Sequence, residues 1–180
     1  MAVVYLGLGA NLGDREANLR AALARLAAAG AHVVAVSSLY RSDAVVPPGE
    51  PPGPEYFNAA AAVETDLAPR ELLALAKRVE RDLGRRPDAP RWSPRPIDMD
   101  LLLYADGRVV DAPDLAVPHP LMHERAFVLL PLAEVAPGVV HPRLRRRVRE
   151  LASAVDPAGV ERVRGPDWAS DDGLVGGTDS

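Results

Sequence analysis

The chain contains no cysteine, which excludes disulfide bridges, thiolate metal sites and cysteine nucleophiles. It has one lysine, Lys77, and eight aromatic residues in a total of 180. A glycine-rich phosphate-binding loop that closes on a lysine is therefore absent, because Lys77 falls within a predicted helix. The scarcity of aromatic residues predicts a core of Ala, Val and Leu, and it makes any exposed aromatic side chain a candidate ligand contact.

Long apolar runs and an excess of positive charge are also missing. No stretch of about 18 consecutive apolar residues occurs, so no membrane-spanning helix is predicted. The uncharged first residues are interrupted by glycines and do not resemble a secretory signal with a basic lead. The net charge of −4 provides no general attraction to nucleic acid or to anionic membranes. We therefore expect a cytoplasmic protein without a nucleic-acid or membrane partner.

The hydrophobic pattern predicts a single domain over residues 1–156 with the element order βαββαβ. Two amphipathic helices are indicated by leucine stripes, and each stripe ends at a glycine. With these helices on one face of an antiparallel sheet, we expect an α+β sandwich of ferredoxin-like type. The predicted strands are residues 2–8, 32–38, 57–65 and 97–104, and the predicted helices are residues 14–29 and 69–83.

A long loop and two short elements complete the prediction up to residue 130. Residues 43–55 contain five prolines and two glycines, which predicts an exposed loop of the kind that acts as a lid. A strand at 108–110 is predicted to pair with its predecessor across the Asp106–Gly107 turn. A shorter helix is predicted over residues 124–130.

The C-terminal part has two distinctive compositions. Residues 143–149 hold five arginines between apolar positions, which predicts a solvated amphipathic helix, with a polyanion-binding patch as the alternative. Residues 157–180 are rich in Gly, Asp and Ser, which predicts a disordered tail.

Asp98 and Asp100 lie two residues apart on a predicted strand, so their side chains point to the same face. Two carboxylates side by side on an otherwise apolar strand repel each other, and a divalent cation that binds both removes this cost. Oxygen ligands without a nearby cysteine favour magnesium over zinc. The pattern predicts a magnesium site, with a solvated acid pair on an edge strand as the alternative.

Arginines gather on the N-terminal side of this strand. Pro94 and Pro96 impose extended geometry on their neighbours, so Arg95 is held three residues before Asp98. Guanidinium groups bind phosphate oxygens two at a time, so cations fixed beside a metal site indicate a phosphate-bearing substrate. Three more arginines are within reach of the same strand end: Arg85, Arg86 and Arg91.

Two other motifs give weaker indications. Gly7, Gly9 and Gly13 resemble a dinucleotide turn, but the third glycine is misplaced and no acidic residue for a ribose follows at the usual distance. We interpret the first two glycines as sites of close backbone packing, including packing against a flat ligand. His119 and His123 are spaced for zinc, but the proline between them disfavours a helix and a third ligand is missing. A histidine that donates to a phosphate is the favoured interpretation.

A close resemblance to the signature of the 6-hydroxymethyl-7,8-dihydropterin pyrophosphokinase family is carried by Gly84-Arg85 and by the run Arg91-Trp92-Ser93-Pro94-Arg95-Pro96-Ile97-Asp98-Met99-Asp100-Leu101-Leu102. The resemblance covers about residues 2–142 and includes segments 5–14, 38–42, 56–60 and 118–127. Members of this family transfer diphosphate from ATP to the hydroxymethyl group of a reduced pterin, releasing AMP, in folate biosynthesis. Their ferredoxin-like α+β fold agrees with the predicted element order.

The resemblance implies a role for each matching residue. Asp98 and Asp100 would bind two Mg²⁺ ions that bridge the ATP phosphates and the pterin hydroxyl. Arg85 and Arg95 would neutralise charge that develops during in-line attack on the β-phosphorus. The pterin would contact Gly9, Ser42, Val45, Tyr56, Asn58 and Phe127, with Tyr56 and Phe127 stacking on its ring. ATP, the co-substrate, would contact Lys77, Glu80, Arg91, Trp92, His119 and Arg125.

The resemblance also implies that residues 43–55 and 85–91 are lids that close over the substrates and exclude water. The chain departs from the family pattern on the nucleotide side, with Ser93 in place of a usual glycine and with Pro87 and Asp88 in place of basic residues. Phe127 has helix packing as its alternative role.

Other functions are disfavoured by the size and surface chemistry of the chain. A nucleotide-sugar transferase that uses an Asp-x-Asp motif needs a larger nucleotide-binding fold. An RNA-binding module needs exposed aromatic motifs or a basic sheet face, and neither is evident in the sequence. The expected partners are ATP and the reduced pterin, and another folate-pathway enzyme is a further candidate partner.

Overall fold

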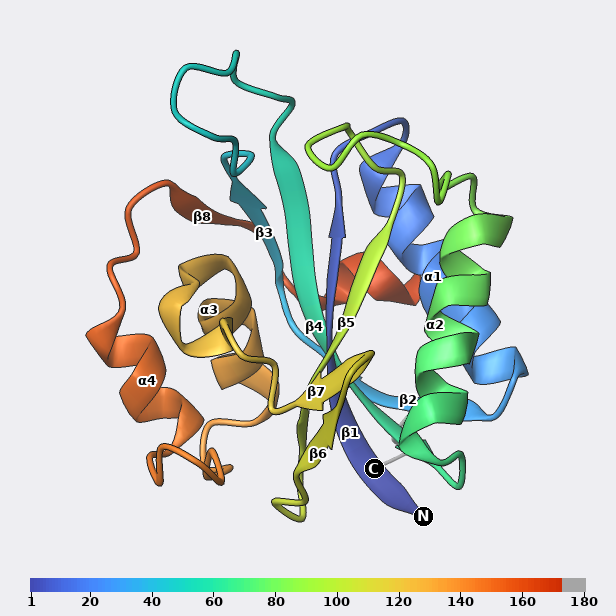
Figure 1. Cartoon of the computed structure of the whole chain (residues 1–180), viewed down its shortest axis with the longest axis vertical. Helices are drawn as coiled ribbons and strands as arrows, with labels where there is room; N and C mark the ends of the chain where they lie inside the picture. Colours follow the sequence, from blue (N-terminus) through green and yellow to red (C-terminus); the bar gives the residue numbers. More distant parts are fainter. Residues whose placement is uncertain (173–180) are drawn as a thin grey trace.

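A computed structural model describes residues 1–172 of the chain. Its centre is an antiparallel sheet with the strand order β5-β1-β4-β3-β8, in which β2 also pairs with β4 (Figure 1). None of the helices within these residues combines the length and apolar character needed to cross a bilayer. The strands are β1 (Ala2–Ala10), β2 (Ala31–Val36), β3 (Leu39–Ser42), β4 (Tyr56–Thr65), β5 (Asp98–Tyr104), β6 (Val110–Ala112), β7 (Leu115–Val117) and β8 (Val160–Arg164). The helices are α1 (Arg15–Ala28), α2 (Pro69–Asp82), α3 (Ala126–Val135) and α4 (Val148–Ala154), with short 3₁₀ helices η1 (Met122–Glu124) and η2 (Pro166–Asp172).

The first two helices begin at residues that satisfy their free backbone donors. Asp14 Oδ1 accepts a 3.1 Å hydrogen bond from the backbone N–H of Ala17 at the start of α1. Helix α2 starts with Pro69, which needs no hydrogen-bond partner at that position. These helices alternate with strands in the predicted order, and the predicted ferredoxin-like α+β class is confirmed. The predicted strand over residues 32–38 corresponds to β2, whereas β3 was not predicted; both strands pair with successive parts of β4.

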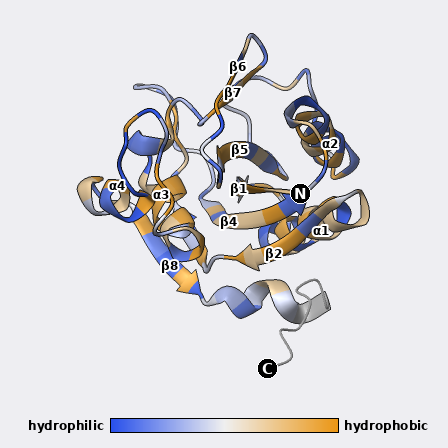
Figure 2. Cartoon of the chain, turned by 90° about the horizontal axis from the view of Figure 1, so that it is seen from below, coloured by the Kyte–Doolittle hydropathy of each residue, from blue (hydrophilic) through white to orange (hydrophobic). Residues whose placement is uncertain are grey.

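Both faces of the sheet are covered, whereas the sequence prediction placed the helices on one face. One core joins the sheet to α1, α2 and η2, and the other joins it to α3 and α4 (Figures 1 and 2). The cause lies in β4, where every residue from Ala59 to Val63 is apolar and buried. A strand that is apolar at consecutive positions must be covered on both sides.

The strand predicted at 108–110 is wrong in its position and in its partner. Strand β6 begins at Val110 and pairs with β7 instead of β5. The Asp106–Gly107 turn does follow β5, but Asp106 Oδ1 accepts the backbone N–H of Arg108 at 2.9 Å. Its Oδ2 also binds the Arg108 guanidinium at 2.8 Å. This local turn removes Arg108 from strand pairing.

The arginine-rich segment 143–149 does not form the predicted helix. Arg145 has a φ of 56°, which a right-handed helix excludes. The segment is instead a tight turn, in which the N–H of Arg145 donates to the carbonyl of His141 at 2.8 Å. Helix α4 begins only at Val148, so most of the arginines precede it.

Residues 157–172 differ from the predicted disordered tail. Strand β8 pairs with β3, and the side chain of Trp168 is fully buried against the α1–α2 face of the sheet. The indole Nε1–H of Trp168 donates to the carbonyl of Ser37 at 2.8 Å. This segment therefore completes the edge of the same sheet. Residues 173–180 lie outside the described part of the chain.

Candidate active site

Four strands contribute residues to a trough on the α3 face at one end of the sheet. In the strand register Gly9 lies opposite both Asn58 and Asp98, and Gly7 lies opposite Asp100. Residues opposite each other in antiparallel strands point to the same face. Since the two glycines carry no side chain, the surface between the carboxylates and Asn58 is bare backbone.

A side chain at either glycine would crowd this surface. A Cβ atom at Gly9 would lie 3.3 Å from Asn58 Oδ1 and 3.4 Å from the Tyr56 ring. At Gly7 it would lie 3.4 Å from the side chain of Leu102. The glycines therefore leave room for a flat molecule to approach the strand closely.

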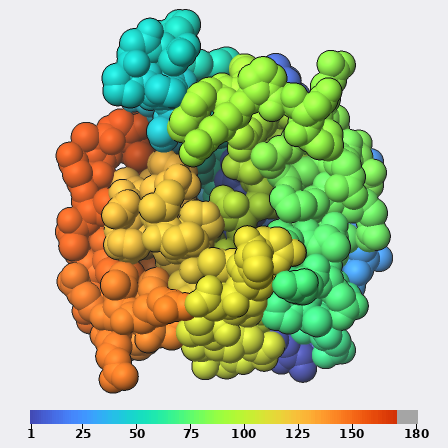
Figure 3. Space-filling view, viewed as in Figure 1, coloured from blue at the N-terminus to red at the C-terminus, as the bar shows by residue number. Residues whose placement is uncertain are grey.

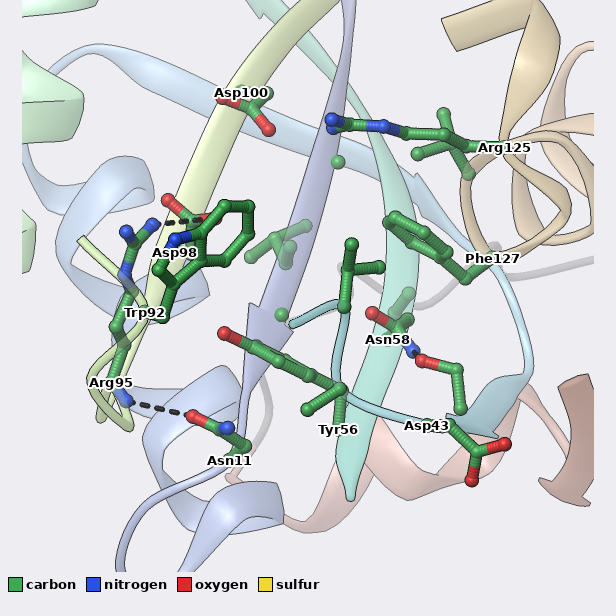
Figure 4. A pocket seen from close by; sticks show the side chains of 18 of the residues that line it. Asn11, Asp43, Tyr56, Asn58, Trp92, Arg95, Asp98, Asp100, Arg125 and Phe127 are labelled. Carbon is green, nitrogen blue, oxygen red and sulfur yellow. Dashed lines mark hydrogen bonds and ion pairs between the residues drawn. The ribbon is translucent and has the colours of Figure 1, made fainter. Parts of the chain in front are cut away.

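A cavity of about 270 Å³ opens over the trough. In Figure 3 it appears as a hollow beneath the loops that precede β4 and β5 and beside α3. Figure 4 shows the two carboxylates entering from β5, Tyr56 from β4, and Phe127 and Arg125 from the start of α3. Twelve predicted site residues line it: Gly9, Ser42, Val45, Tyr56, Asn58, Arg91, Trp92, Arg95, Asp98, Asp100, Arg125 and Phe127.

The other four predicted residues lie outside this lining. Arg85 Nη1 donates to Asp98 Oδ1 at 2.7 Å and also to the carboxylate of Glu80, which is 4% exposed on α2. Lys77 is exposed on α2. His119 is half-buried after β7, where burial and the Arg125 charge lower its pKa.

The carboxylates occupy different electrostatic surroundings. Asp98 lies between two arginines, with Arg85 Nη1 at 2.7 Å and Arg95 Nη1 at 3.6 Å. Burial, followed by the charge of Asp98, raises the pKa of Asp100 to about 6, although Arg125 and Arg85 oppose the shift. The pair therefore carries an electrostatic cost that a bound cation would relieve.

The opposite side of the trough carries a fixed amide and two aromatic rings. Asn58 is 5% exposed and its Nδ2 donates to Ser42 Oγ at 2.7 Å, which fixes the orientation of the amide. Burial and the nearby Asp98 charge raise the pKa of Tyr56, so its hydroxyl stays protonated at neutral pH. Tyr56 and Phe127 face the cavity in Figure 4.

The loop before β5 exposes an aromatic surface beside the carboxylates. Trp92 is 46% exposed, and the Arg91 guanidinium lies 4.9 Å from the centre of its ring. An indole of this kind is free to stack on another flat group.

Asn11, which no sequence motif indicated as a site residue, lines the cavity and is 5% exposed. Its Oδ1 accepts the backbone N–H of Arg95 at 2.7 Å, as drawn in Figure 4. The available signal was a polar residue placed between an apolar strand and a capped helix, which is also what an ordinary turn contains. The lining further includes Asp43, Ala44, Ser93 and Val128.

The donor set is compatible with magnesium. Across residues 1–172, no group of three or more His, Cys, Asp and Glu side chains is arranged to hold a metal ion. The geometry therefore gives no support to zinc at His119 and His123. Two carboxylates alone suit Mg²⁺, which usually keeps several waters and takes its remaining ligands from substrate phosphates.

Comparison with known proteins agrees with the resemblance noted in the sequence. The sequence model of the family described as 7,8-dihydro-6-hydroxymethylpterin-pyrophosphokinase (HPPK) matches residues 5–137. The 2-amino-4-hydroxy-6-hydroxymethyldihydropteridine pyrophosphokinase of Methylorubrum extorquens is 44% identical over 164 residues, which cover 91% of this chain and 99% of the relative. The protein of the same name from Bacillus subtilis is 43% identical over 138 residues, 76% of this chain and 80% of the relative.

The fold is also similar to that of longer solved proteins. A Plasmodium falciparum HPPK-DHPS structure with pterin and p-hydroxybenzoate superimposes with a TM-score of 0.65 at 15% identity. The similarity covers 84% of this chain but 42% of that one, so this chain spans less than half the length of the solved protein.

Proposed function

The chain belongs to the 7,8-dihydro-6-hydroxymethylpterin-pyrophosphokinase (HPPK) family, and we propose that its cavity performs the family's reaction with Mg²⁺ held on Asp98 and Asp100. The enzyme transfers diphosphate from ATP to the hydroxymethyl group of 6-hydroxymethyl-7,8-dihydropterin and releases AMP, a step of folate biosynthesis. The main support for the proposal is the trough over Gly7 and Gly9, which has carboxylates on one side and amide and aromatic groups on the other.

Asp98 and Asp100 would bind two Mg²⁺ ions together with the phosphates of ATP. When bound, the ions would neutralise phosphate charge and orient the attacking hydroxyl group. The placement of both carboxylates in one partly buried cavity supports this assignment, because like charges there require a counter-ion.

Arg85 and Arg95 would bind the phosphate groups during transfer. Both contact Asp98, at 2.7 and 3.6 Å, and so lie at the border of the proposed metal site. Once the charge of Asp98 is neutralised by its metal, both guanidinium groups can turn to phosphate oxygens. They would then stabilise the negative charge that develops as the bond to AMP breaks.

The reduced pterin would occupy the trough over Gly9. Asn58, oriented by Ser42, would read the polar edge of the ring, and Tyr56 and Phe127 would stack on its two faces. Val45 lies in the loop before β4 and is 57% exposed, so it would cover the ring only when that loop closes.

ATP would lie against the loop before β5 and the start of α3. Trp92 offers an exposed indole for the adenine ring, and Arg91 and Arg125 offer charge to its phosphates. Lys77, Glu80 and His119 would form the outer part of this site. We further propose that another folate-pathway enzyme binds this chain.

The proposal is tested by identifying the reaction products and by measuring kcat of site variants. With Mg²⁺, ATP and the reduced pterin, the protein should release AMP in step with pterin diphosphate. Asp98→Ala and Asp100→Ala should each lower kcat on the order of 100- to 1,000-fold while leaving the circular dichroism spectrum unchanged. Asp106→Ala, an exposed acidic residue just beyond the other end of β5, is the matched control. Full turnover in either site variant, or ADP as the main product, would contradict the proposal.

A further inference from the structure

The backbone of Arg95 is held by a single residue, Asn11. Arg95 lies between Pro94 and Pro96, so its N–H is the only backbone donor in that tripeptide. Asn11 Oδ1 accepts this N–H at 2.7 Å, and the backbone N–H of Asn11 donates to the Arg95 carbonyl at 3.0 Å. Both polar backbone groups of Arg95 are therefore bound to one partner.

This backbone position determines where the Arg95 side chain can reach. Its Nη1 lies 3.6 Å from Asp98 Oδ2, and its Nη2 donates to the carbonyl of Arg91 at 2.6 Å. A guanidinium group attached to a fixed Cα and tethered to its own loop loses less freedom when it binds a phosphate.

The same amide of Asn11 also contacts the loop on the pterin side. Its Nδ2 donates to the carbonyl of Pro54 at 3.2 Å, near the end of the loop of residues 43–55. The other end of that loop supplies Asp43, Ala44 and Val45 to the cavity. Asn11 is thus the point at which the two loops that flank the site are joined by hydrogen bonds.

We propose that Asn11 is a positioning residue that sets Arg95 for diphosphate transfer and couples this arginine to the loop that covers the pterin. The inference rests on the proposed function of the cavity. Asn11 acts through its neighbours. Its Oδ1 holds the backbone of Arg95 for the transfer step, and its Nδ2 holds the loop at Pro54 that covers the bound pterin.

A nearby asparagine supplies the matched control. Asn18 Nδ2 donates to the carbonyl of Leu12 at 3.1 Å, in the turn that joins β1 to α1. This bond is also between a side chain and the backbone, but Asn18 does not line the cavity. Asn18→Ala should therefore leave kcat and both KM values unchanged.

The decisive measurement is a double-mutant cycle between Asn11 and Arg95. Asn11→Ala should lower kcat on the order of 100-fold, because the arginine loses its placement. If Asn11 acts through Arg95, then Asn11→Ala combined with Arg95→Ala should have no lower kcat than Arg95→Ala alone. Losses of kcat that multiply, or an Asn11→Ala variant with the kcat of the wild type, would overturn the inference.

Asn11→Asp separates the two roles, and it replaces Asn11→Ala in the test if that variant shows no melting transition above the assay temperature and is therefore unfolded. The carboxylate keeps an acceptor for the Arg95 N–H but has no donor for the Pro54 carbonyl. KM for the reduced pterin should rise about tenfold, with kcat within a few-fold of the wild type. A large fall in kcat with unchanged KM would overturn the assignment. A wild-type protein that releases no AMP would instead refute the proposed function.

Discussion

At the scale of single residues, the site combines groups that would each be unfavourable alone. Asp100 is buried beside another carboxylate, and Asp98 attracts two arginines that the proposed reaction needs elsewhere. Such arrangements lower the stability of the protein without its ligands, and they persist at sites where ligands relieve them. Without bound metal, the protein should therefore be less stable than a variant in which one of these charges is removed.

We expect Asp100→Asn to be more stable than the wild type in EDTA at pH 8. The folded pKa of Asp100 is raised to about 6 from an ordinary 3.8, so the folded state binds the proton more tightly than the unfolded state does. The stability linked to this proton is complete below about pH 3.8 and is lost as the pH rises through about 6. Asparagine imitates the protonated form at every pH. The difference in melting temperature should open between pH 4 and 6 and stay constant above 7.

Asp106 provides a control of opposite sign. Hydrogen bonds from Arg108 lower the pKa of this exposed carboxylate, so Asp106→Asn should be neutral or slightly destabilising at pH 8. If Asp100→Asn melts below the wild type at pH 8 in EDTA, the electrostatic description of the carboxylate pair is wrong.

At the scale of elements, the C-terminal segment supports the strand that borders the proposed pterin site. Strand β8 pairs with β3, with Val160 opposite Ser42 and Glu161 opposite Arg41. Arg41 in turn binds Glu161 and Glu55, each at 2.5 Å, so it joins β8 to the start of β4. The segment thereby supports the β3 end of the loop that contributes Val45, and Arg41 of β3 binds the other end at Glu55.

The two tryptophans of the chain should respond to mutation in opposite ways. Trp168 is fully buried and hydrogen-bonded, so Trp168→Ala should cost about 3–5 kcal/mol. This corresponds to a fall in melting temperature of roughly 10 °C, with AMP release retained well below the transition. Trp92 is 46% exposed, so Trp92→Ala should change stability by less than about 0.5 kcal/mol. It should instead raise KM for ATP about tenfold through lost stacking.

The melting temperature and the KM for ATP of both variants test these predictions. A Trp168→Ala protein that melts like the wild type would show that η2 does not stabilise the fold. A Trp92→Ala protein with unchanged KM for ATP would place the adenine elsewhere.

The sequence predicts the elements whose pattern is local. The leucine stripes of α1 and α2, their glycine ends, the apolar run of β1 and the alternation at the start of β5 depend on neighbouring residues alone. These elements appear within a few residues of their predicted bounds. The elements that were missed depend on distant partners. Strand β8 exists because β3 has a free edge, and the predicted helix α3 lies with α4 on the second face because β4 is apolar at every position from Ala59 to Val63. Neither relation can be predicted from the sequence of the segment alone.

The same distinction holds for the site. Asp98 and Asp100 share a strand, so their spacing alone predicts that they face one side. Asn11 contacts Arg95 and Pro54 across separations of 84 and 43 residues, and no local pattern predicts these bonds. Arg85 reaches Asp98, 13 residues further along the chain, because α2 packs beside β5.

At the scale of the whole molecule, the layered fold leaves one end of the sheet open for substrates. Both faces are packed with helices, so ligands reach the strands where β1, β4 and β5 meet beneath two loops (Figures 1 and 3). The net charge of the chain is −4, and the cavity is lined by three carboxylates, Asp43, Asp98 and Asp100, together with three arginines. A polyphosphate that approaches without a cation is repelled at long range by the net charge and, beside Asp98 and Asp100, by the two carboxylates at contact.

Binding of ATP should therefore require the metal, and mutation of the carboxylates should remove that requirement. With Mg²⁺ and ATP at about 100 times its Kd, the native state gains about 2.7 kcal/mol, a rise in melting temperature of roughly 5–10 °C. With ATP and EDTA the wild type should gain far less. In the Asp98→Asn/Asp100→Asn double variant, the repulsion from these two carboxylates is gone, Arg95 loses its carboxylate partner, and Arg85 keeps only Glu80. This variant should be stabilised by ATP to a similar extent with and without Mg²⁺. If ATP in EDTA stabilises the wild type as much as ATP with Mg²⁺ does, the nucleotide binds without the carboxylate-held metal.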